Sequence, residues 1–149
     1  MTMIDCADCK LANGKPAACC QEISIRMGIA TDMKFWDDLR WMVAHKNVSV
    51  ARKISDGEWY VIFETECEQL TSHGRCWVYD SRPNICADYS SKTCIINGSG
   101  DIYDLEFNSY EDFTQYMKDT VVPEYEKDLN QSQIKIKKSI DRIKNWPLR

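Results

Sequence analysis

The chain has 149 residues and a formal net charge of −4, and its apolar and charged fractions are 44% and 28%. This length indicates one domain that buries a hydrophobic core. The acidic balance argues against a nucleic-acid partner, because phosphate neutralisation needs a basic face, and no stretch approaches the run of about 18 apolar residues of a membrane helix, so no membrane partner is expected.

The first predicted helix follows an irregular segment, residues 1–22, in which Asn13-Gly14-Lys15-Pro16 is typical of a turn. Thr31 or Asp32 is suited to cap a helix over about Met33–His45. Its apolar residues fall on one face at helical spacing, and they include Trp36, Leu39 and Val43.

Two β-rich runs come next, Val48–Ile54 and Trp59–Phe63, on either side of an Asp56-Gly57 pair. This pattern predicts an antiparallel hairpin whose second strand ends just before Cys67. A further short hairpin is expected after Cys94, because Ile95-Ile96 and Ile102-Tyr103 flank a Gly-rich turn.

The chain beyond Phe107 is predicted to be helical. Ser109 and Asp112 resemble a capping box, and Phe113, Tyr116 and Met117 follow at core-facing spacing. Pro123 is expected to end or kink this helix. A last helix from about Glu124 carries an apolar side made of Tyr125, Leu129, Ile136, Ile140 and Ile143.

Together these elements predict a small single-domain α+β fold with antiparallel hairpins, a cysteine-rich metal-binding loop region and C-terminal helices. Residues 1–107 are expected to form the metal-binding core, and residues 108–149 a helical C-terminal extension. The extension is polarised, since Asp104–Asp128 holds eight acids against two lysines and Leu129–Arg149 holds six bases against one acid. Two attracting helical faces are the simplest interpretation, with docking of an acidic protein partner as the alternative.

The most informative stretch is Cys67–Cys94, in which four cysteines are separated by eight, nine and seven residues, with turn formers between them. A segment this short and interrupted cannot build its own core, so disulfides or a metal must hold it together. The N-terminus has no secretory signal, which predicts a cytoplasmic protein whose thiolates act as ligands rather than as disulfides. The predicted metal ligands are Cys6, Cys9, Cys19, Cys20, Cys67, Cys76, Cys86 and Cys94.

Thiolate sulfur selects zinc, cuprous copper or iron–sulfur clusters over hard cations. Only Cys6-x-x-Cys9 is a tight knuckle of the zinc-finger kind, and ferredoxin runs are denser than this spacing. More than four thiols with aromatic residues near them favour an iron–sulfur cluster or iron slightly, and zinc is a near-equal alternative.

These residues resemble the YkgJ-type cysteine-cluster family, which is described as holding zinc- or iron-chelating domains. The resemblance covers about residues 6–94 and implies a bound zinc, iron or iron–sulfur centre, with no agreed biochemical activity. The matching positions are Cys6, Cys9, Cys19, Cys20, Cys67, Leu70, Gly74, Cys76, Tyr79, Asp80, Arg82, Pro83, Cys86 and Tyr89.

Arg82 and Tyr79 are the predicted cofactor-binding residues beside the cysteines. Arg82 is suited to donate hydrogen bonds to cluster sulfurs, or alternatively to pair with Asp80 or Asp88 as a staple of the loop. His73 is an alternative zinc ligand in the same loop.

The predicted function is an intracellular metal-binding protein that holds an iron–sulfur cluster or zinc through cysteine thiolates. Two alternatives stay open. One is a metal-dependent redox or group-transfer enzyme or accessory subunit. The other is a metal-free thiol or disulfide redox protein.

Overall fold

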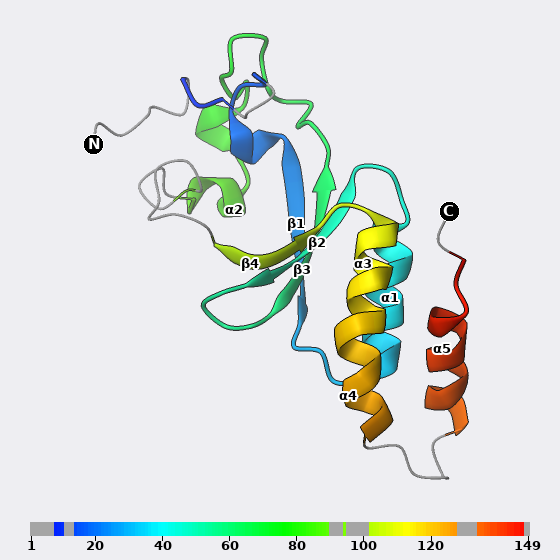
Figure 1. Cartoon of the computed structure of the whole chain (residues 1–149). Coiled ribbons are helices and arrows are strands. Elements are labelled where there is room, and N and C mark those ends of the chain that lie inside the picture. The colour runs from blue at the N-terminus through cyan, green and yellow to red at the C-terminus, as the bar shows by residue number, and fades with distance from the viewer. Residues whose placement is uncertain (1–7, 11–13, 90–93, 95–101, 128–133, 148–149) are drawn as a thin grey trace. The chain divides into compact units, whose positions relative to one another are not determined.

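The computed structural model describes residues 8–10, 14–89, 94, 102–127 and 134–147. Its helices and its four-stranded sheet confirm the predicted α+β class (Figure 1). The strands occur in the spatial order β1-β3-β2-β4, so β1 and β4 form the two edges. Their bounds are Glu22–Gly28 for β1, Val48–Lys53 for β2, Trp59–Glu64 for β3 and Tyr103–Phe107 for β4.

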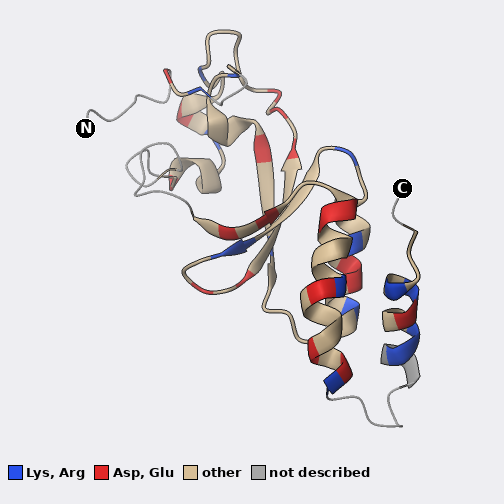
Figure 2. Cartoon of the chain, viewed as in Figure 1, with Lys and Arg blue, Asp and Glu red and all other residues tan. Residues whose placement is uncertain are grey.

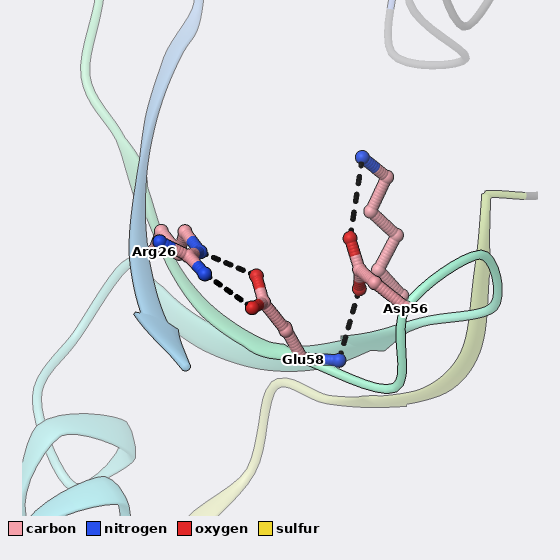
Figure 3. Close-up of polar contacts among 4 residues, drawn as sticks. Arg26, Asp56 and Glu58 are labelled. Carbon is pink, nitrogen blue, oxygen red and sulfur yellow. Dashed lines mark hydrogen bonds and ion pairs between the residues drawn. The ribbon is translucent and has the colours of Figure 1, made fainter. Parts of the chain in front are cut away.

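The β2–β3 hairpin matches the sequence prediction. Its turn is closed by two backbone bonds, from the Lys53 N–H to the Glu58 carbonyl and from the Gly57 N–H to the Lys53 carbonyl, both 2.9 Å long. The Asp56 carboxylate accepts a further bond from the Glu58 N–H at 2.9 Å (Figure 3). Gly57 has a φ of 70°, a conformation that side chains with a Cβ atom rarely adopt.

The two edge strands were harder to predict. β4 pairs antiparallel with β2, and Phe107 lies opposite Val50. The hairpin expected around residues 95–103 falls largely outside the described residues. β1 was not predicted, although its Ile23, Ile25 and Met27 alternate with polar residues and glycine as strand residues do.

Helix α1 spans Met33–Val43, and Asp32 caps it by accepting a 2.8 Å bond from the Phe35 N–H. The helix therefore begins where predicted and ends two residues before His45. α1 packs against β2, α3 and α5. Its Trp36 ring meets the Trp59 ring edge to face at 5.1 Å between centroids, and this contact lies at the centre of an aromatic core.

The helix after β4 is continuous through three segments, α3 (Tyr110–Tyr116), the π-helical η3 (Met117–Val121) and α4 (Val122–Lys127). The Ser109 hydroxyl accepts a 3.2 Å bond from the Asp112 N–H, which confirms the predicted cap. The helix does not end at Pro123. The wider π turn directly before the proline accommodates a ring that lacks an N–H and would clash with a carbonyl of a regular α-turn.

The last helix, α5, spans Ile134–Lys144. It therefore begins ten residues after the predicted start at Glu124, which belongs to α4. Ile140 and Ile143 of α5 are fully buried. Figure 2 shows that the described part of α5 carries mostly Lys and Arg among its charged residues. Lys144 of α5 pairs with Glu126 of α4, in agreement with the predicted attraction between an acidic and a basic helix.

The chain divides into two compact units, each built from two separate stretches. Unit 1 comprises Met1–Ser24 and Phe63–Ile102, and unit 2 comprises Ile25–Ile62 and Tyr103–Arg149. Among the described residues, the buried apolar side chains of unit 1 are only Ala17 and Ala18, whereas unit 2 buries a full set of large ones. No helix in the described part of the chain has the length and apolar character to cross a bilayer.

Candidate metal centre

The first cysteine block in unit 1 is a closed loop. The Ala17 N–H donates to the Cys9 carbonyl at 2.8 Å, and Lys10 and Pro16 form a bridge inside that closure. The loop leads into η1 (Ala18–Cys20), a short 3-10 turn that carries Cys19 and Cys20 next to each other. Cys6 lies outside the described residues.

Gln21 also holds this loop, a role that no pattern in the sequence indicates. Its side chain is buried, and its Nε2 donates to the Pro16 carbonyl at 2.8 Å. Its Oε1 is buried without a hydrogen-bond partner within the described ranges. A polar residue after a cysteine pair is an ordinary surface pattern, so only the fold reveals that Gln21 ties the loop to the cysteine turn.

The second block is a hairpin-like loop with Cys67 and Cys76 on its two arms. Leu70 and Cys76 form an antiparallel bridge, and the Trp77 N–H donates to the Gln69 carbonyl at 2.8 Å. The tip turns between Thr71 and Arg75, and the Thr71 N–H donates to the Arg75 carbonyl at 2.8 Å. This geometry returns Cys76 toward the arm that begins at Cys67.

The two blocks meet where β1 and β3 leave the sheet. The Thr65 N–H donates to the Gln21 carbonyl at 2.9 Å, and the Cys67 N–H donates to the Cys20 carbonyl at 2.8 Å. These bonds extend the pairing of β1 and β3 beyond their ends. Cys20 and Cys67, which are far apart in the sequence, are therefore neighbours along the backbone.

The pKa of Cys20 shows which other thiols lie near it. Burial raises the pKa of the Cys20 thiol to about 12, and the charge and hydrogen bond of Cys19 and the charges of Cys67 and Cys76 act in the same direction. The thiols of Cys19, Cys67 and Cys76 thus lie close enough to Cys20 to oppose its ionisation. We call these four the thiol cluster.

The donor chemistry of the thiol cluster fits a zinc ion or an iron–sulfur centre, both of which take four thiolates. Within the described ranges, however, no three potential ligand side chains are arranged as a finished metal-binding group. The backbone bonds bring the thiols near each other, and metal binding requires their side chains to turn toward a common point.

The structure gives less support for the other predicted ligands, Cys9, Cys86 and Cys94. None of the seven described cysteines forms a disulfide. Cys86 is exposed on α2 (Asn84–Ala87), and Cys9 and Cys94 are half-buried. None of these three cysteines is among the described side chains that shift the pKa of Cys20. Their role as ligands stays a prediction.

Arg82 and Tyr79, the predicted cofactor-binding pair, contact each other. The Arg82 guanidinium lies over the Tyr79 ring at 4.0 Å from its centroid, a cation–π contact that the sequence did not predict. His73 lies exposed at the loop tip, where its Nδ1 is 3.1 Å from the Ser72 hydroxyl. The tip position separates His73 from the arms that carry Cys67 and Cys76.

Comparison with known proteins places no relative beside this chain: no family model, no curated protein and no solved structure matches it.

Proposed function

We propose that this protein binds a metal centre, an iron–sulfur cluster or alternatively zinc, through the thiolates of Cys19, Cys20, Cys67 and Cys76. One observation carries the proposal. The thiol cluster lies in a unit whose described buried apolar side chains are only two alanines. A unit with so little core gains stability from a bound metal, because the free energy of metal binding is also free energy of folding.

Charge supports the same conclusion. Each thiolate of the cluster disfavours ionisation of Cys20, so four thiolates without a counter-charge would repel one another. A cation with two or more positive charges reverses that repulsion and holds coordinating thiols in the ionised form. The soft sulfur donors select zinc or iron–sulfur chemistry over calcium or magnesium.

A metal-free redox role receives less support from this geometry. The reactive species of a redox cysteine is the thiolate, which a low pKa favours. Burial and the neighbouring cysteines raise the pKa of Cys20 instead, so this thiol stays protonated near neutral pH without a metal.

The test is the metal and acid-labile sulfide content, with a visible absorption spectrum, of protein purified without oxygen or chelator. Iron with sulfide and a broad absorbance near about 400 nm would identify an iron–sulfur centre. Zinc in a colourless sample would identify the alternative. Metal-free protein from such a preparation, with no uptake on reconstitution, would refute the proposal.

Variants assign the ligands. We expect Cys20→Ser and Cys67→Ser each to lose most of the bound metal, because serine is a poor substitute for a thiolate ligand. His73→Asn is the matched control in the same loop and should retain the full metal content. Equal losses in the cysteine variants and in the control would point to a general effect on the loop. Serine variants of Cys6, Cys9, Cys86 and Cys94 then decide which further cysteines are ligands.

A further inference from the structure

β1 is an edge strand with an apolar, solvent-facing surface. It is the first strand in the sheet order, and within the described residues no strand pairs with its outer edge. Ile23 is 54% exposed and Ile25 is 50% exposed. An exposed edge strand that carries isoleucines is a template for pairing with another strand.

The orientation of the β1 backbone follows from its bond to the β3 segment. The Gln21 carbonyl faces Thr65, from which it accepts a bond. The Glu22 N–H belongs to the same planar peptide group as this carbonyl and points the opposite way, and the backbone groups of successive strand residues then alternate between the two edges. The N–H and carbonyl groups of Glu22, Ser24 and Arg26 therefore point to the outer edge, where a new strand would bond to them.

The sequence of this edge is complementary to itself. If two copies of Glu22–Arg26 pair antiparallel about Ser24, Glu22 lies opposite Arg26, Ile23 lies opposite Ile25, and Ser24 meets its own copy. The outward-facing residues become the hydrogen-bonded pairs, and the isoleucines become the closer non-hydrogen-bonded pairs. We propose that β1 forms a homodimer interface by pairing with the β1 strand of a second copy of this chain.

Charge decides the register. Charged residues commonly protect an edge strand from pairing. Here each Glu22 meets an Arg26, so the charges attract in the arrangement centred on Ser24. Centring on Ile25 instead would place Arg26 opposite Ser24 and Glu22 opposite Gly28, which removes both charge pairs. The same side chains therefore favour one register and disfavour its neighbour.

Arg26 remains accessible for this second contact. Its guanidinium forms a bidentate pair with Glu58, the residue directly before β3 (Figure 3), yet its side chain is still 66% exposed. Guanidinium has five N–H donors, and the bidentate pair uses two of them. The exposed donors can bind the Glu22 carboxylate of the second copy.

Five residues from each copy bury less area than a stable dimer, which needs roughly 1,200 Å² in total. We therefore expect a reversible dimer with a Kd of about 10 to 100 µM. Sedimentation equilibrium of the full chain across this range measures it. A chain that stays monomeric up to about 500 µM, well above that Kd, would overturn the proposal.

A charge exchange tests the register. Glu22→Arg and Arg26→Glu should each weaken the dimer by about tenfold through like-charge contacts, and the double variant should restore the wild-type Kd within about threefold. The intrachain pair with Glu58 is lost in both Arg26→Glu and the double variant, so restoration reports only on the contact between copies. Failure of the double variant to restore dimerisation would refute this register.

Two proline variants test the backbone direction. Ser24→Pro removes an outward N–H and should abolish the dimer while circular dichroism and the Tm stay close to wild type. Ile25→Pro removes an inward N–H and should unfold the edge of the sheet. A dimer that survives Ser24→Pro in a folded chain would contradict pairing along this edge.

Discussion

Asp32 caps α1 by accepting a hydrogen bond from the Phe35 N–H, one of the N–H groups of the first turn that has no partner within the helix. We expect Asp32→Ala to lower the free energy of unfolding by about 1 kcal/mol, because an N-cap side chain satisfies a donor that alanine leaves open. Urea unfolding measures the change. Thr31→Ala is the control, since Thr31 was the other candidate cap, and it should change stability by less than about 0.5 kcal/mol. A larger loss for Thr31→Ala than for Asp32→Ala would contradict this assignment.

Glu58 links stability to pH. The hydrogen bond and charge of Arg26 hold the pKa of the Glu58 carboxyl below its usual value. A carboxyl whose pKa is lower in the folded state stabilises the fold above its ordinary pKa and loses this contribution as pH falls. We expect unfolding free energy to decline less steeply between about pH 5 and pH 3 in Glu58→Gln than in wild type, and by a small amount because the pair is exposed. Identical acid limbs for the two proteins would show that the pair does not contribute.

Single residues were predictable where their partner is close in sequence. Asp32 and Ser109 act on N–H groups three residues away, so a local pattern indicates them. Arg40 is different. Its side chain pairs with Asp37 at 2.7 Å, and its guanidinium lies 5.9 Å from both the Tyr110 and the Trp146 ring centroids. Two of these three partners come from distant parts of the chain, and only folding brings them together.

The turn between β2 and β3 depends on one backbone conformation. Gly57 has a positive φ, and a Cβ atom built there would meet nothing within 4 Å. We expect Gly57→Ala to cost about 1 kcal/mol of unfolding free energy through backbone strain alone. Gly57→Asn should cost less, since asparagine tolerates this conformation. Thermal or urea unfolding of both variants checks the order, and an asparagine variant less stable than the alanine variant would contradict it.

Elements were predictable when both partners were local. The β2–β3 hairpin encloses a short Asp-Gly turn, and α1 carries its periodicity within a few turns. β4 bonds to β2 across about 50 residues, from Lys53 to Tyr103. No local pattern specifies such a pairing, because strand partners are chosen by tertiary packing. β1 was missed for the related reason that its isoleucines remain exposed rather than marking a buried face.

The unequal cores of the two units predict unequal responses to mutation. In Cys67→Ser we expect faster hydrogen exchange at the amide of Cys67, which bonds to the Cys20 carbonyl, and at the amides of Leu70 and Trp77, which bond within the second cysteine block. The amides of α1, in unit 2, should keep their protection, because large buried side chains such as Trp59 and Phe113 stabilise that unit. Exchange measured by mass spectrometry on peptide fragments resolves the two regions. Equal loss of protection in both would show one cooperative unit.

At the scale of the whole molecule, the sequence predicted the fold class and the meeting of two cysteine blocks. It did not indicate which thiols form the cluster. Cys20 and Cys67 become neighbours through a backbone bond that continues the pairing of β1 and β3, and β1 itself was not foreseen. The sequence shows how many cysteines are available as ligands, whereas the pairing of the strands determines which of them lie close together.

The π turn at η3 changes the number of residues per turn in the helix that contains it. Its Val122 N–H bonds to the Met117 carbonyl five residues earlier, so the turn holds one more residue than an α-turn. Each residue of an α-helix advances the face by about 100°. A regular α-helix that carried this extra residue would turn everything after it by that angle, whereas the π turn takes up the residue within one turn and leaves Val122 buried. A chain shorter by one residue within Met117–Val121 would therefore fit a regular α-turn at the same place, and the helix after it would keep its buried face.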